Sequence, residues 1–294
     1  MIGLDLTSMD HDLLKYIGQL AEVVRPERIY FINIQQNLDV EDDLKPFLSN
    51  PDVPLDEHIK GQMMERVERH FPNYKDFDCE FDVIEGSPTH ELLKWAHIKE
   101  VELVLMGRKK KMNGSGVVPQ QIARKCSCSI LFVPEGVEFK LDKILGPIDF
   151  SDHSGAAINA AFHMKEGIEV DTCYIATLPS GYYAAGKSET EFVGILKKNA
   201  EKDFGKFKKK IDPNHGDVVF IVEHDENPVG RIYTLAKEIN ADLIAIGGRG
   251  RTLASAIFLG SMTEKLIALD ADTPLLVVKR KDKSFDFWDA IKKI

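Results

Sequence analysis

The chain has 294 residues, which is enough for two domains of about 140 residues, each with its own hydrophobic core. A hydrophobic content of 44%, a charged content of 29% and a net charge of −9 are typical of a globular protein, and the charge argues against a general nucleic-acid binder. No apolar run approaches the roughly 18 residues of a membrane span, and the acidic N-terminus lacks the basic region of a secretory signal. We therefore expect a cytoplasmic protein without nucleic-acid or membrane partners.

In the first half, apolar strands alternate with amphipathic helices. A short strand at the N-terminus is followed by a helix with apolar residues at positions 13, 14, 17, 20, 21 and 24. Pro88 stands where a later helix can begin, because proline suits the first helical position. The further strands of this half are predicted at residues 28–34, 79–84, 103–107 and 130–133.

The second half repeats this order. ILGPIDFSDHS at residues 144–154 resembles MIGLDLTSMDH at the N-terminus, with Asp149 opposite Asp5, and Pro228 corresponds to Pro88. The matching strands are predicted at residues 171–176, 218–222, 243–247 and 275–278, an offset of 140 to 145 residues.

This alternation predicts an α/β fold: two tandem five-stranded parallel sheets with helices on both faces, Rossmann-like and packed together as a pseudo-dimer. We expect domains at residues 1–138 and 139–281, joined with little linker. An amphipathic tail follows at residues 282–294, where Phe287, Trp288, Ile291 and Ile294 share a helical face that could dock on protein.

The most informative motif is the loop GGRGRTLASAIFLGS at residues 247–261. It follows a strand, and ligands of open parallel sheets lie beyond the carboxyl ends of the strands. Gly247 and Gly250 would let backbone approach a ligand, and the free N–H groups of a helix opening at Gly260–Ser261 favour a phosphate. Two alternatives remain open: Ser261-x-x-Glu264 has the spacing of a capping box, and glycines also end strands for structural reasons.

The spacing Gly247-x2-Gly250-x9-Gly260-Ser261 resembles the nucleotide-binding signature of the universal stress protein family. The flanking segments agree: DFSDHS from Asp149, ADLI before the loop and TPLLVV after it. The resemblance covers nearly the whole chain as two copies. It implies five-stranded domains of the adenine nucleotide alpha hydrolase-like type that dimerise through the last strand.

The resemblance also implies ATP, or a related adenine nucleotide with or without Mg²⁺, bound in the second domain. The implied contacts are Pro147, Asp149 and Ala176 on the adenine side, and Gly247, Arg249, Gly250, Gly260, Ser261 and Thr263 on the ribose and phosphate side. A carboxylate at position 149 can accept hydrogen bonds from a base amine or a ribose hydroxyl. Its alternative role is to cap the helix that follows.

The first half departs from the signature. Lys110 stands where the second glycine is expected, and the loop from Gly107 is about five residues shorter than the loop from Gly247. We therefore expect this half to bind no ATP, or a different ligand. The basic run at residues 108–111 is interpreted as a solvated loop, with attraction of an anion or a nucleic-acid backbone as the alternative.

The remaining candidates are weaker. The cysteines at 79, 126, 128 and 173 are expected to be free thiols, and the histidines show no metal spacing. The pair at His224–Asp225 is interpreted as an ordinary loop rather than part of a pocket.

Taken together, the sequence predicts a nucleotide-dependent sensor or adaptor of a stress response, in which two chains pair as a homodimer and an unknown protein is the partner. No catalytic residue is assigned, because no water-positioning group is evident. The alternatives are a nucleotide-independent interaction protein and a slow ATPase.

Overall fold

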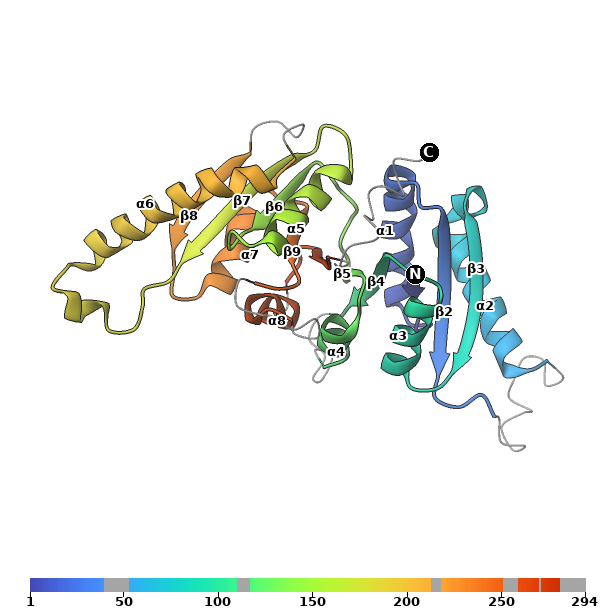
Figure 1. Cartoon of the computed structure of the whole chain (residues 1–294). Helices are drawn as coiled ribbons and strands as arrows, with labels where there is room; N and C mark the ends of the chain where they lie inside the picture. Colours follow the sequence, from blue (N-terminus) through green and yellow to red (C-terminus); the bar gives the residue numbers. More distant parts are fainter. Residues whose placement is uncertain (40–52, 110–116, 213–217, 251–258, 270, 281–294) are drawn as a thin grey trace. The chain divides into compact units, whose positions relative to one another are not determined.

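The structure is a computed structural model that describes residues 1–39, 53–109, 117–212, 218–250, 259–269 and 271–280. The chain divides into two compact units, residues 1–139 and 140–283 (Figure 1), which we call unit 1 and unit 2. The predicted tail at residues 282–294 lies outside the described residues.

Unit 1 alternates strands and helices from its first residues. Its strands are β1 (Ile2–Gly3), β2 (Arg28–Gln35), β3 (Asp78–Glu85), β4 (Leu103–Arg108) and β5 (Ser129–Pro134). Its helices are α1 (Met9–Val24), α2 (Leu55–His70), α3 (Pro88–Ile98) and α4 (Val117–Lys125), with a 3₁₀ turn at Pro72–Asp76. The strand order is β3-β2-β1-β4-β5, and neighbouring strands are parallel.

Unit 2 has the same succession of elements. Its strands are β6 (Lys143–Pro147), β7 (Glu169–Ala176), β8 (Val219–His224), β9 (Leu243–Gly247) and β10 (Leu275–Val278). Its helices are α5 (Asp152–His163), α6 (Glu189–Phe207), α7 (Pro228–Glu238) and α8 (Ser261–Ala268), with 3₁₀ turns at Tyr182–Ala185 and Lys208–Lys210. Its strand order, β10-β9-β6-β7-β8, is that of unit 1 read in reverse, and its pairings are also parallel.

The predicted α/β fold class is confirmed, and the reason is visible in the burial pattern. Every residue of β9 and β10 is buried, as expected for strands covered on both faces. Helix α1 buries the predicted positions Leu13, Leu14, Ile17, Leu20 and Ala21. Helices α3 and α7 begin at the two prolines, where the missing N–H leaves no hydrogen bond unmade.

The two units also share unusual backbone conformations. Leu6 (φ 59°) and Phe150 (φ 64°) are left-handed residues directly after the corresponding aspartates, Asp5 and Asp149. Each aspartate accepts the backbone N–H of the second residue after it at 3.0 Å. The turn that leads from the first strand into the first helix is therefore built in the same way in both units.

Candidate functional site

The candidate site lies at the carboxyl edge of the unit 2 sheet. Strand β6 pairs with β7 on one side and with β9 on the other. The strands that follow β6 in the sequence are therefore added first on one side of it and then on the other. In parallel α/β sheets, such a switch point is where ligands bind. Three predicted residues end these strands: Pro147 ends β6, Ala176 ends β7 and Gly247 ends β9. All three are buried.

Asp149 follows β6 and lies against the glycine loop. Its Oδ1 accepts the backbone N–H of Ser151 at 3.0 Å. A Cβ atom placed on Gly250 would come within 2.9 Å of Asp149 Oδ2. The half-buried carboxylate thus lies close to the loop backbone, and a side chain at position 250 would collide with it. The cap of α5 is Ser151, whose hydroxyl accepts the N–H of Ser154, so Asp149 is not the N-cap.

Gly247 has a packing reason to be glycine. A Cβ there would lie 2.6 Å from the carbonyl oxygen of His153, in the first turn of α5. In unit 1, a Cβ on Gly107 would lie 2.6 Å from Cγ of Met9, in the first turn of α1. At Gly247 the backbone of α5 can approach the strand end only because a side chain is missing, whereas at Gly107 an added Cβ would meet only the flexible side chain of Met9.

The last part of the motif opens helix α8. Gly260 is its N-cap, and its N–H donates to the carbonyl of Gly248 at 3.0 Å. Ser261 is the first helical residue and is exposed. The alternative that Ser261 caps the helix is therefore wrong, because the N-cap is Gly260 and no side-chain cap bond is present. The N–H groups of the first turn of a helix lack intrahelical acceptors and attract anions.

Thr263 ties α8 to the glycine loop. Its buried hydroxyl donates to the carbonyl of Gly247 at 3.0 Å. This bond joins the first turn of α8 to the end of β9. A groove of about 370 Å³ lies beside this helix, lined by Ser261, Met262 and Lys265 of α8 and by Asn227 and Pro228 at the start of α7, among others.

Charged side chains of both signs lie near His153 at this edge of the sheet. Burial lowers the pKa of His153, and the charges of Arg249 and Arg280 lower it further. Arg280 also forms an ion pair with Asp152 at 3.4 Å. Sequence reasoning missed His153 and Arg280; the DFSDHS segment was a signal for His153, whereas nothing local pointed to Arg280. The middle of the loop, residues 251–258, lies outside the described residues.

Comparison with known proteins agrees with this arrangement. Residues 140–279 match the model of the universal stress protein family. A universal stress protein of Methanocaldococcus jannaschii, MJ0577, is 32% identical over 157 residues, which are 48% of this chain and 96% of that protein. The chain belongs to the universal stress protein family.

One of the solved structures of the family shows the same fold over a longer stretch. A universal stress protein from Archaeoglobus fulgidus has a TM-score of 0.60 at 18% identity, with 97% of each chain covered. A universal stress protein solved in complex with cAMP is 17% identical, with a TM-score of 0.34 over 47% of this chain and 96% of that one. The first comparison shows that the fold of the family extends over both units.

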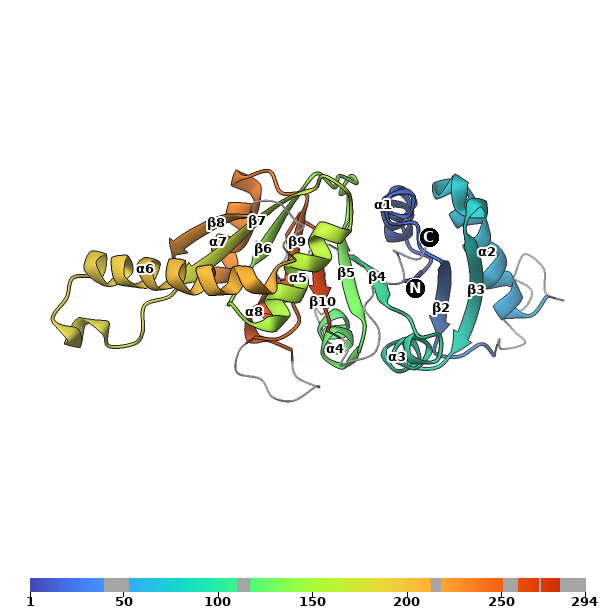
Figure 2. The ribbon, with the colours of Figure 1, turned by 45° about the horizontal axis from the view of Figure 1, so that its top comes forward.

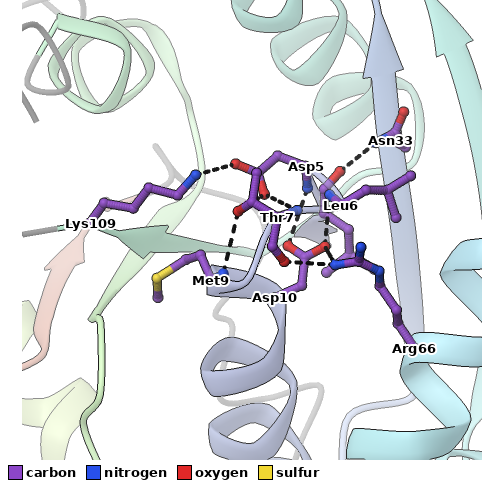
Figure 3. Close-up of polar contacts among 9 residues, drawn as sticks. Asp5, Leu6, Thr7, Met9, Asp10, Asn33, Arg66 and Lys109 are labelled. Carbon is purple, nitrogen blue, oxygen red and sulfur yellow. Dashed lines mark hydrogen bonds and ion pairs between the residues drawn. The ribbon is translucent and has the colours of Figure 1, made fainter.

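Unit 1 has different side chains at the edge of its own sheet that corresponds to the motif-bearing edge of unit 2 (Figure 3). Lys109, which corresponds to Arg249, forms an ion pair with Asp5 Oδ2 at 3.0 Å. The hydroxyl of Thr7 donates to Asp5 Oδ1 at 2.6 Å. Burial alone would raise the pKa of Asp5, but the hydrogen bonds from Thr7 and Lys109 lower it overall. Lys110 and Lys111 lie outside the described residues.

A second carboxylate of unit 1 lies beneath the first. Asp10, on the first turn of α1, is 2% exposed and accepts the backbone N–H of Leu6 at 2.8 Å. Arg66 of α2 lies 3.6 Å from its Oδ2 and donates to the carbonyl of Thr7 at 2.7 Å (Figure 3). Burial raises the pKa of Asp10 to about 6. Ser154 stands at the corresponding position of α5, so only unit 1 has this ionisable group.

The other predicted candidates are placed as follows. His224 ends β8 beside Ala176, and its Nε2 is buried without a hydrogen-bond partner among the described residues. All four cysteines are free, as expected; Cys126 and Cys128 are buried with their sulfurs 2.8 Å apart. Within the described ranges, no group of metal-binding side chains gathers and no helix has the length and apolarity to cross a membrane.

Proposed function

We propose that unit 2 binds ATP or a related adenine nucleotide at the carboxyl edge of its sheet. The observation that carries this proposal is the contact between the Asp149 carboxylate and the backbone at Gly250, beside the start of α8. It brings a hydrogen-bond acceptor for a nucleoside next to a helix N-terminus suited to phosphate. Asp149, the glycine at position 250 and the start of α8 come from separate segments of the sequence. Their proximity at one edge of the sheet supports the proposal.

Each predicted residue has a role consistent with its position. Asp149 accepts hydrogen bonds from the base amine or the ribose hydroxyls, while the buried strand ends at Pro147 and Ala176 form the floor on the adenine side. Arg249 and the exposed hydroxyl of Ser261 contact phosphate. The remaining residues hold the shape of the cradle: Gly247, Gly250 and Gly260 by lacking side chains, and Thr263 through its bond to Gly247.

A magnesium ion, where one accompanies the nucleotide, would be held by the phosphates. The described part of the chain offers no cluster of protein ligands for it. Such an ion would supply charge neutralisation at the phosphates. No residue described at this edge is assigned to position a hydrolytic water, and the proposed role is that of a nucleotide-dependent sensor or adaptor in a stress response, with the chain in the cytoplasm.

In unit 1, the same edge favours a structural role. The cation of Lys109 already neutralises the carboxylate that corresponds to Asp149. A nucleotide there would have to displace this ion pair, and the glycine at the second signature position is replaced by Lys110. We infer that unit 1 binds no adenine nucleotide.

The test is to denature freshly purified protein and to identify the released nucleotides by chromatography and mass spectrometry. One adenine nucleotide per chain supports a site in unit 2 alone, and two per chain would refute the inference on unit 1. If none is released, titration calorimetry with ATP, ADP and cAMP follows. Failure of all three to bind would overturn the proposal and favour an interaction protein that needs no nucleotide. Phosphate release during the titration would favour the slow ATPase.

A further inference from the structure

Helix α6 is longer than the sheet surface that it covers. In Figures 1 and 2 its N-terminal part projects from unit 2, together with the 3₁₀ turn at Tyr182–Ala185. The buried residues of α6 are Ala200, Phe204 and Phe207, all in its last eight positions. Phe204 stacks on Phe220 of β8 with ring centroids 3.9 Å apart. The C-terminal part thus belongs to the core of unit 2, and we call residues 182–199 the arm.

The arm carries apolar side chains that the sheet does not cover. Four of its five residues from 192 to 196 are Phe192, Val193, Ile195 and Leu196. Ile195 is 41% exposed, and Tyr183 of the 3₁₀ turn is 77% exposed. Phe192 contacts the ring of Tyr182 within the arm, at 6.0 Å between centroids. An apolar stretch on a helix that leaves its own core is typical of an interaction surface.

The corresponding helix of unit 1 lacks this feature. Helix α2 buries Ile59, Met63 and Val67, and the first of these is already its fifth residue. The first buried residue of α6, Ala200, is its twelfth. The projecting apolar stretch is therefore a property of α6 and not of the fold.

A glycine lies in the middle of the apolar stretch. Glycine is unfavourable inside a helix, and a Cβ at Gly194 would meet no atom within 4 Å. Packing inside unit 2 therefore does not require Gly194. The next residue is the exposed Ile195, so the surface has a hole beside a protruding side chain.

Charged residues flank the stretch on both sides. Lys187, Glu189 and Glu191 precede it, and Lys197, Lys198, Glu201, Lys202 and Asp203 follow it. When the helix is turned around and laid against a copy of itself about a two-fold axis between Gly194 and Ile195, Glu191 of each copy comes opposite Lys198 of the other. The same two-fold axis places Ile195 of each copy over Gly194 of the other copy. These two forms of complementarity favour a second copy of the same chain over an unrelated protein.

We propose that the arm pairs in antiparallel fashion with the arm of a second chain, with Ile195 of each copy packed against Gly194 of the other. The interface consists of a few helical turns, below the area of a standard stable complex, so the association is reversible and dependent on concentration. Salt weakens it, because the flanking charges are exposed. The contact is independent of nucleotide binding and of the last-strand dimer of the family.

The test is sedimentation equilibrium of the full chain at concentrations up to about 100 µM, a range that brackets the affinities of small interfaces. The wild-type chain is expected to dimerise. The variant Ile195→Asp should weaken dimerisation about 100-fold, because both copies lose the buried isoleucine and gain a buried charge. The matched control is Ile98→Asp at the exposed end of α3, where the side chain is 59% exposed; it should leave dimerisation unchanged.

A second variant separates the proposed contact from general damage to the arm. Gly194→Leu has room in the single chain and raises the helix propensity, yet it fills the hole that the partner needs. It should keep or raise the helix content seen by circular dichroism while it weakens dimerisation at least tenfold. A monomeric wild-type chain, a dimer unaffected by both arm variants, or equal weakening by Ile98→Asp would each overturn the proposal.

Discussion

Asp5 of unit 1 and Asp149 of unit 2 occupy the same turn, yet they have different neighbours. Asp149 faces the backbone of Gly250, whereas Asp5 is paired with the ammonium group of Lys109. One carboxylate lies beside the backbone of a signature glycine, and the other lies beside a lysine of its own unit. The comparison teaches that a duplicated fold can keep the backbone geometry of a turn while a few side chains change what its carboxylate contacts.

The largest effect is expected when the unit 1 residue, Lys110, is introduced at the corresponding position of unit 2. Gly250→Lys places a side chain against Asp149 Oδ2 and a cation beside its carboxylate. We expect nucleotide binding to fall by more than about 100-fold, measured by titration calorimetry. Gly205→Lys adds the same charge to α6, where a Cβ meets no atom within 4 Å, and should bind normally. Equal affinity of both variants would contradict the proposed site.

The buried carboxylate of Asp10, in unit 1, predicts that the free energy of unfolding depends on pH. The pKa of Asp10 is about 6 in the folded chain and lies near 3.8 ordinarily, so between these values the folded state holds a proton that the unfolded chain has lost. This contribution to stability is fully present below about pH 4 and is lost as the pH rises through about 6, a change of about 3 kcal/mol.

Denaturant unfolding at about pH 4 and about pH 7 measures this change. In Asp10→Asn the group cannot ionise, so stability should fall less between the two pH values than in the wild type. Ser154→Ala, at the corresponding position of unit 2, should retain the wild-type pH dependence. If stability changed with pH in Asp10→Asn as much as in the wild type, another group would be responsible for the titration.

The two equivalent aspartates should differ in their effect on ligand binding. Asp149→Asn keeps the shape of the side chain and removes its charge, so affinity for an adenine nucleotide should fall about tenfold, as expected for one charged hydrogen bond. Asp5→Asn is the matched control in unit 1 and should leave affinity unchanged. If Asp5→Asn weakened binding as much, the nucleotide would be in unit 1.

The smallest expected effect is on the ion pair of unit 1. Lys109→Ala should change the free energy of unfolding by less than about 1 kcal/mol, because the side chain of Asp5 is 57% exposed and solvent screens the pair. The variant should also gain no nucleotide site, because position 110 remains lysine. Release of a second nucleotide per chain would show that Lys109 alone keeps the site closed.

Much of the fold follows from patterns that are local in the sequence. The predicted strands at residues 243–247 and 275–278 match β9 and β10 residue for residue, because short apolar runs bounded by charged residues, glycine or proline have clear ends. Strand β8 was predicted about two residues short, since its last residues, Glu223 and His224, are polar. The repeat offset placed the remaining strands to within a few residues.

The features that could not be predicted depend on contacts between distant residues. Lys109 and Asp5 are separated by 104 positions, and the pairing of the two requires knowledge of how β1 and β4 align. The projection of the arm is likewise invisible in the sequence, because the apolar period of α6 continues smoothly from Phe192 to Phe207. Only the extent of the sheet beneath it shows where burial stops.

The tight contacts of Gly107 and Gly247 change the diagnostic value of the glycine signature. Both glycines lie against a residue in the first turn of a neighbouring helix, the backbone of His153 in the unit with the signature and the side chain of Met9 in the unit without it. The first glycine thus has a packing role of its own, and its presence alone is not evidence of nucleotide binding. The second glycine, which lies beside Asp149 in unit 2 and is lysine in unit 1, is the more informative position to compare among related sequences.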